Sequence, residues 1–338
     1  DTSTVGSPGW WMAKGQNKIR ADFDHLNDLI SRVEGDSPLA HGADPRLYEA
    51  YCQFQKKARA NWADVIIRSR RERIRLNGFG TAADNDSDGD GIAMDMAKRA
   101  RLLAELPDAV EFALMTGRGP MIVGRSDGKT LVTAEDPREM AIFRNPADKT
   151  IRAGFKIKAD PDMGWMRAYL YWTQGDTHYC HVARKEIPVG STVWPVFTES
   201  WDWDPDFGGA DGQVLPTETL PIVELTSRHG VGVFERHRDL LDKITLQTLQ
   251  GLVIMSMQAY KQRAAIGLPD EDEDGNEYDW DGILQAGPGA MWNLPEGVEL
   301  IELNEASLAG LLEFQKDSRR ELSDLTATPL RASVSDSA

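Results

Sequence analysis

The chain has 338 residues, of which 41% are hydrophobic and 27% are charged. This length exceeds that of one average domain, and the composition excludes a disordered chain. The formal net charge of −16 comes from 38 basic and 54 acidic residues. Such an acidic balance excludes a protein that binds nucleic acid by neutralising phosphates over a broad surface.

The two cysteines, Cys52 and Cys180, cannot form a disulfide framework, and no Cys-x-x-Cys pair is present. This usage is typical of an intracellular protein whose thiols are structural. The longest apolar run, Leu252–Met257, is far shorter than a membrane span needs. We therefore expect no membrane partner.

The N-terminal region is predicted to be helical. Apolar residues recur at spacings of three and four between Ile19 and Val33, which predicts a helix that ends at Gly35. The same pattern from Tyr51 to Val65 predicts a second, longer helix that runs toward Gly78. Arginines crowd the end of that helix, where cations favour the helix dipole. They are Arg68, Arg70, Arg71, Arg73 and Arg75.

Two shorter helices are expected at about 92–104 and 107–116, the second beginning at Pro107. After Gly117 the apolar residues alternate, which indicates strands separated by Asp-Gly, Asn-Pro and Asp-Pro turns. The expected strands are 121–123, 130–133, 140–143, 151–157, 166–172, 178–182 and 193–197. Short turns between consecutive strands predict one antiparallel, meander-like sheet.

A helix of nearly thirty residues is expected from Glu235, and between Leu249 and Met257 it is apolar almost all round. Such a helix must be covered on more than one side. Pro269 stops it, and the twelve residues 270–281 then hold eight carboxylates and no base. A strand-rich insert leads to a last helix, with Asn304 as its N-cap and Pro329 beyond its end.

Two acidic loops resemble calcium-binding loops. Residues 84–95 place Asp84, Asp86 and Asp88 at positions one, three and five, with Gly89 sixth and Asp95 twelfth. Calcium loops prefer Glu at position twelve and an apolar residue at position eight, where this chain has Gly91. The spacing recurs from Asp270 to Asp281, and a solvated turn explains both loops as well. We assign no metal site and keep calcium binding as an alternative.

Ser126 lies in Gly124-Arg-Ser-Asp-Gly128, the pattern of a hydrolase nucleophile elbow. That elbow joins a strand to a helix, whereas Asp127-Gly128 between two apolar runs predicts a β-hairpin. A Walker-type phosphate loop at Gly124–Thr130 is one residue short and also lacks the helix it needs. His178 and His181 face opposite sides of an expected strand and make a poor metal pair. We expect no enzyme and no cofactor, with a serine hydrolase as the remaining alternative.

Several short segments, in this order, resemble the portal proteins of tailed bacteriophages, particularly those of phages that infect actinobacteria. They are Asn61–Ile67 with Gly78-Phe79, Ala134–Met140, Leu220–Leu225, Thr248–Gln250 with Gln258–Arg263, Gly267–Asp270, Gly287–Trp292 with Leu294–Gly297, and Leu325–Pro329. Each segment is short, but their order along most of the chain is specific.

The resemblance implies an α+β portal fold with an α/β wing, a helical stem and a small α/β clip. Residues 1–232 would be the wing, 233–265 the first stem helix and 266–304 the clip. Residues 305–327 would be the second stem helix, and 328–338 the start of the tunnel loop. The long helix and crown that follow this loop in portals are absent from this chain.

The resemblance also implies a viral protein of the virion, present in the host cytoplasm during assembly. Such proteins form a ring, expected to be a dodecamer, at one vertex of the capsid, through which DNA is packaged and ejected. Partners would be the major capsid protein and scaffold, the terminase large subunit, a head–tail adaptor and the double-stranded DNA in the channel. An acidic wall suits a conduit because it repels phosphate over about 10 Å.

Three groups of residues are assigned on this basis. Ring packing is assigned to Leu252, Ile254 and Met255. Partner docking at the clip is assigned to Asp270, Glu271, Asp272, Glu273 and Asp274. Contacts with DNA in the channel are assigned to Lys316, Arg319, Arg320 and Arg331, although pairing with nearby carboxylates explains these cations equally well.

Overall fold

A computed structural model describes residues 2–36, 56–58, 60–80, 89–126, 128–190, 201–258, 263–269, 280, 297–302 and 309–329. The chain mixes helices and antiparallel sheets, so the expected α+β class is confirmed. It divides into two compact units. The sheet unit comprises Asp1–Pro38 and Asn61–Arg236, and the helix unit comprises Leu39–Ala60 and His237–Ala338.

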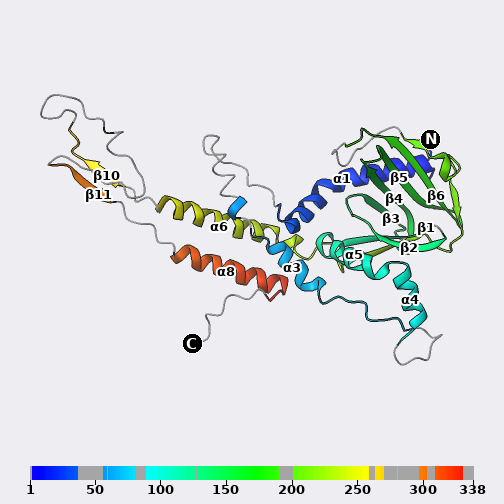
Figure 1. Ribbon diagram of the computed structural model, residues 1–338, viewed down its shortest axis with the longest axis horizontal. Coiled ribbons are helices and arrows are strands. Elements are labelled where there is room, and N and C mark those ends of the chain that lie inside the picture. The colour runs from blue at the N-terminus through cyan, green and yellow to red at the C-terminus, as the bar shows by residue number, and fades with distance from the viewer. Residues whose placement is uncertain are drawn as a thin grey trace. The chain divides into compact units, whose positions relative to one another are not determined.

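Of the described helices of the sheet unit, the first and the last lie against its two sheets (Figure 1). The helices are α1 (Pro8–Glu34), α3 (Trp62–Arg71), α4 (Gly91–Arg99) and α5 (Leu102–Thr116). The larger sheet runs in the order β3 (Met140–Arg144), β4 (Ile151–Asp160), β5 (Trp165–Gln174), β6 (Thr177–Glu186) and β7 (Asp202–Trp203), and β8 (Gln213–Leu215) also pairs with β6. The smaller sheet has the order β2 (Lys129–Ala134), β1 (Arg118–Ser126), β9 (Ile222–Thr226).

The expected meander is therefore confirmed from β3 to β6, whereas β1 and β2 form the expected hairpin but belong to a separate sheet. Strand β1 pairs with β2 through a hairpin on one edge and with β9, about a hundred residues later, on the other. The spacing of turn residues cannot predict a partner strand that is so distant in the sequence. The strand expected at 193–197 lies outside the described residues.

Helix α1 forms as the sequence predicts. The Ser7 side chain accepts a hydrogen bond from the Trp10 N–H, and Gly35 ends the helix in the left-handed region at φ 84°. Its apolar face, including Met12 and Ile19, packs on the larger sheet around Phe155 and Leu170. Gly15 faces this sheet so closely that a Cβ atom there would overlap the Phe155 ring.

The other helix boundaries differ from the expectation for local reasons. Asn61 caps a new helix by accepting the Asp64 N–H at 3.2 Å, so α3 begins at Trp62, and it ends seven residues before Gly78. Arg101 has φ 64°, which separates α4 from α5. Pro107 therefore lies inside α5 rather than at its start. Pro107 is exposed, so water can solvate the carbonyl that it leaves without an N–H partner.

Helix α5 covers the smaller sheet, and the two sheets meet through their apolar faces. Ala109 of α5 packs with Met121 and Val132. Ile122 and Ile222 of the smaller sheet pack with Met140 of the larger one. The sheet unit thus has a core on each side of the smaller sheet.

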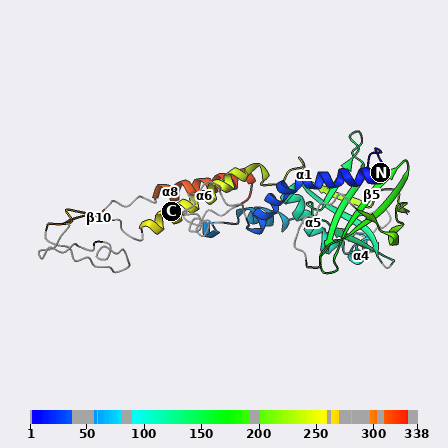
Figure 2. The same ribbon diagram turned by 90° about the horizontal axis from the view of Figure 1, so that it is seen from above.

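The helix unit contains α6 (Arg238–Gln258) and α8 (Ala309–Thr326), which lie side by side in Figure 2. It also contains an antiparallel pair, β10 (Arg263–Ile266) with β11 (Glu299–Glu302). The long helix expected from Glu235 thus begins at Arg238, after a single 3₁₀ turn over Glu235–His237. The expected N-cap Asn304 lies outside the described residues.

Candidate assembly interface

Hydrogen bonds between polar side chains join helices α6 and α8 along their line of contact, which we call the polar seam. The Gln247 amide donates to the Ser318 hydroxyl at 3.1 Å, and the Gln315 amide donates to the Thr248 hydroxyl at 2.8 Å. Gln247 and Ser318 are both buried. Hydrogen bonds of this kind fix the register of two helices because an unmatched buried amide is costly.

A second connection lies along the same seam. The Lys243 ammonium is 3.6 Å from the Glu321 carboxylate and 4.8 Å from the centre of the Phe314 ring. Both contacts are partly exposed, so each contributes little to stability by itself. Together with the two amide bonds they hold α6 and α8 in one register.

The helix pair leaves large apolar side chains in solvent. On α6, Leu246 is 44% exposed and Met255 is 58% exposed. On α8, Leu312, Phe314 and Leu325 are 58%, 52% and 53% exposed. Single exposed apolar side chains are common on protein surfaces, but several large ones on two neighbouring helices indicate an interaction surface.

These exposed side chains lie on opposite sides of each helix. Successive helical residues turn by about 100°, so the nine residues between Leu246 and Met255 turn the helix by about half a revolution. By the same relation, Leu312 lies about 200° from Phe314, which shares its side with Leu325. Helix α6 therefore presents one apolar group on each of two opposite sides, whereas Phe314 and Leu325 lie on the same side of α8 as buried Ser318.

The residues predicted for ring packing lie within this region. Leu252 and Ile254 are half-buried, and Met255 is exposed. Sequence reasoning missed Leu246 and Phe314 because it searched for a continuous apolar run. For Leu246, the signal that would have found it is a large apolar residue on the polar side of the helix, next to exposed Asp242 and Gln250.

The predicted DNA-channel cations divide into two kinds. Lys316 and Arg320 are exposed on α8, on the side away from buried Ser318 and Leu322. Arg319 is half-buried, and its Nε atom is not accessible to solvent. Arg331 and the predicted docking residues Asp270–Asp274 lie outside the described part of the chain.

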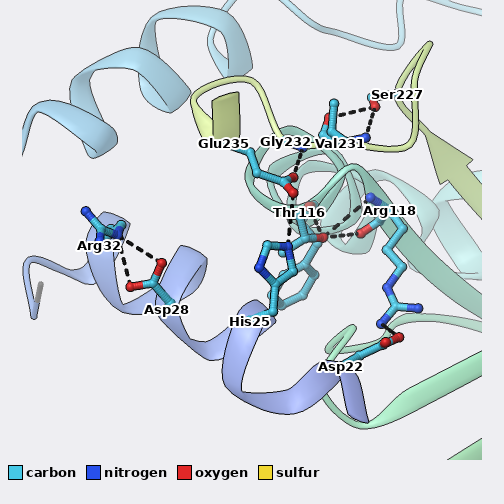
Figure 3. A network of polar contacts seen from close by, with 11 residues as sticks. Asp22, His25, Asp28, Arg32, Thr116, Arg118, Ser227, Val231, Gly232 and Glu235 are labelled. Atoms are coloured by element: carbon cyan, nitrogen blue, oxygen red, sulfur yellow. Dashed lines mark hydrogen bonds and ion pairs between the residues drawn. The ribbon is translucent and has the colours of Figure 1, made fainter. Parts of the chain in front are cut away.

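The chain segment that leads to α6 is anchored by a polar network (Figure 3). One Glu235 carboxylate oxygen accepts the Gly232 N–H at 2.7 Å, and the other is 3.0 Å from the His25 Nε2 atom of α1. The Ser227 hydroxyl closes the preceding bend by donating to the Val231 carbonyl at 2.7 Å and accepting the Val231 N–H at 3.1 Å. The sequence analysis gave Glu235 only as the start of the long helix and assigned no role to His25.

The same segment rests on the end of α5. The Val233 N–H donates to the Leu114 carbonyl at 2.8 Å, and the Ser227 N–H donates to the Gly117 carbonyl at 3.0 Å. A Cβ atom at Gly232 would overlap the Met115 carbonyl, so this contact requires glycine. Three backbone and side-chain attachments thus fix the last residues of the sheet unit before the long helix.

One cavity of the sheet unit, about 620 Å³, is lined by several carboxylates that form ion pairs within the protein. Asp136 lies 2.7 Å from Arg138, and Glu139 lies 2.9 Å from Lys158. Arg71 reaches Glu111 at 2.7 Å. Burial raises the pKa of Glu139, and the hydrogen bond and charge of its partner Lys158 partly oppose this increase. Among the described residues, no group of acidic, histidine or cysteine side chains could hold a metal ion.

The hydrolase alternative is contradicted by the fold around Ser126. Strand β2 begins at Lys129, and Ser126 pairs with Lys129 across the hairpin. A nucleophile elbow needs a helix at this point. The calcium alternative is not resolved, since residues 81–88 and 270–279 lie outside the described part. Asp90, at the end of the first acidic loop, caps α4 by accepting the Ala93 N–H at 2.9 Å.

The histidine and cysteine side chains of β6 have structural roles. His178 is 2.9 Å from the Thr173 hydroxyl, whereas His181 is only 2% exposed on the other face and accepts the Trp172 indole N–H at 3.1 Å. His181 therefore departs from the expectation of a surface histidine. Burial raises the pKa of the Cys180 thiol to about 11, so this thiol is not a nucleophile near neutral pH.

No protein-family model matches the chain, and no curated protein matches it. Within the residues that the structure describes, none of the helices has the length and hydrophobicity to span a bilayer.

Proposed function

We propose that the chain is a portal-type subunit that assembles into a closed ring and lines a conduit for double-stranded DNA. The observation that carries the proposal is helix α6 of the helix pair, which exposes Leu246 and Met255 on two opposite sides, its two flanks. A two-fold dimer would cover the same patch on both copies and leave the other flank in water. Different patches on opposite flanks favour head-to-tail contacts, which close into rings when the rotation permits.

The remaining features agree with this role. The order of portal-like segments runs through both units of the chain. The net charge of −16 favours passage of a polyanion over its retention. In this role the terminase large subunit, a head–tail adaptor, the major capsid protein and scaffold are its partners.

Two variants, each altering one flank, test the head-to-tail interface. Leu246→Glu should disable one flank and Met255→Glu the other, so each variant alone should be a folded monomer by native mass measurement. Mixing the two variants leaves one intact interface, between the unaltered flank of each, and should give a one-to-one dimer. The unaltered chain should form a ring that negative-stain images show directly.

Met163→Glu is the matched control, because Met163 is 68% exposed but lies in the turn between β4 and β5. This variant should still form rings. If the unaltered full-length chain remains a folded monomer at micromolar concentration, or if the mixed variants stay monomeric, the ring proposal is wrong.

A further inference from the structure

A second cavity of the sheet unit, about 480 Å³, lies beside the start of α1. The turn Thr4–Pro8 borders it on one side, and the side chains of β5 and β6 border it on another. It is separate from the helix pair to which the proposed function is assigned. Its volume is sufficient for one long side chain or a small ligand.

An aromatic wall forms part of this cavity. The rings of Trp172 and Tyr179 are stacked with centroids 5.4 Å apart and planes 26° apart. The His181 ring lies 6.0 Å from Trp172 and is held edge-on to Trp203 at 5.3 Å. These contacts between aromatic rings keep the side chains of the wall rigid, so a ligand would meet a preformed surface.

The cavity is negatively charged. Asp211 is the one acidic side chain on its described lining, which has no lysine or arginine, and it is exposed. Burial lowers the pKa of His181, although a hydrogen bond to the Ala210 backbone and the Asp211 charge oppose this effect. Because the Nδ1 atom of His181 accepts the Trp172 indole N–H, its proton is on Nε2 and the ring is neutral. An entering cation would therefore meet no positive charge.

Three polar side chains of the lining can offer hydrogen-bond acceptors to a ligand. The carboxylate of Asp211, the amide of Gln174 and the hydroxyl of Tyr179 form no hydrogen bond with any described residue. Each can accept an N–H donor from a ligand. A group that combines a flat cationic face with several N–H donors matches this set of features.

We propose that this cavity binds a guanidinium group, supplied by an arginine side chain of a partner protein. A guanidinium is planar, stacks on aromatic rings and carries five N–H donors in a fixed arrangement. A lysine ammonium is a more strongly hydrated point charge and uses the aromatic wall less well. A neutral ligand would leave the Asp211 carboxylate without a counter-charge.

Calorimetric titration with blocked peptides tests this site. An acetylated and amidated arginine tripeptide, with alanine on each side, should bind at least about tenfold more tightly than the same peptide with citrulline, which has a similar shape but no charge. The lysine peptide should fall between them. Asp211→Asn should weaken binding of the arginine peptide by about tenfold, with no change in the melting temperature.

Asp206→Asn is the matched control, since Asp206 is an exposed carboxylate of the neighbouring 3₁₀ turn that does not line the cavity. It should bind the arginine peptide like the unaltered chain. Equal binding of the arginine and citrulline peptides, or an unchanged affinity in Asp211→Asn, would overturn the proposal. Free arginine that binds as tightly as the blocked peptide would overturn the assignment to a protein segment. None of these outcomes depends on ring assembly.

Discussion

Burial of His181 makes the stability of the sheet unit depend on pH. Burial lowers the pKa of this group below its ordinary value of about 6.5, so the unfolded chain takes up the proton first as the pH falls. Stability is therefore fully present above the ordinary pKa. It should decrease as the pH falls from about 6.5 toward the lower pKa of the folded state.

Urea unfolding at pH 7, 6 and 5 measures this effect. In a His181→Gln variant, the loss of stability between pH 7 and pH 5 should be smaller than in the unaltered chain, whatever the starting stability. His229→Gln changes an exposed histidine and should keep the full pH dependence. An identical pH slope in His181→Gln would show that other groups cause it.

Gly15 tests how closely α1 packs on the larger sheet. A Cβ atom there would overlap ring and side-chain carbons of Phe155, which is itself fully buried. Gly15→Ala should therefore destabilise the sheet unit by about 1–3 kcal/mol, although alanine favours a helix. Gly91→Ala in α4 is the control, because no atom lies within 4 Å of the added carbon. A Gly15→Ala variant as stable as Gly91→Ala would mean that helix and sheet are farther apart than described.

At the scale of elements, the sequence predicts the parts with a local cause. The ends of α1 follow from Ser7 and Gly35, and the β1–β2 hairpin follows from Asp127-Gly128, since each is decided by a few neighbouring residues. The partition of strands into two sheets depends on β9 pairing with β1, a contact between distant segments. The break at Arg101 depends on a positive φ that an arginine does not signal.

The candidate interface was predictable to a similar extent. The apolar run near Ile254 pointed to α6 but gave no indication of which of its apolar groups are exposed. Their exposure depends on which side α8 covers, and α8 is separated from α6 by about fifty residues. The anchor at Glu235 joins residues about two hundred positions apart, so spacing alone could not reveal it.

The seam between α6 and α8 leaves one buried acceptor without a partner. The Oε1 atom of Gln247 forms no hydrogen bond, whereas its Nε2 atom donates to Ser318. Ser318→Ala should therefore destabilise the helix pair by about 1–3 kcal/mol, because it leaves the whole amide unmatched. The double variant Gln247→Leu with Ser318→Ala should recover most of this loss, since no polar group then remains unpaired.

Thermal unfolding of both single variants and the double variant measures the coupling between the two residues. Ser323→Ala on the same helix is a suitable comparison, because its hydroxyl bonds only to the nearby Thr328 carbonyl. If Gln247→Leu and Ser318→Ala have additive effects, the seam does not hold the two helices together.

For the whole molecule, the positions of individual charges affect the proposed passage of DNA more than the net charge does. A conduit with a net charge of −16 repels DNA, so a few cations facing the duplex would have a large relative effect on its passage. Of the four candidates, Lys316 and Arg320 are exposed, whereas Arg319 is half-buried. Among the three candidates that the structure describes, the exposed pair is suited to transient phosphate contacts, and Arg319 is better explained as part of the packing of α8.

The difference in exposure between these cations gives a prediction for DNA packaging. Reversing the charge of Lys316 and Arg320 to Glu should lower the DNA packaged per assembled particle by about twofold or more, because each lost phosphate contact weakens attraction independently of base sequence. Ring assembly and melting temperature should stay near the unaltered values, since both side chains lie away from buried Ser318 and Leu322. Arg319→Glu should instead lower the stability of the helix pair.

The control reverses Lys98 and Arg99, two exposed cations of α4, and should leave packaging unchanged. Normal packaging by particles built from the Lys316 and Arg320 variant would assign these cations to solubility alone and remove their role at the DNA.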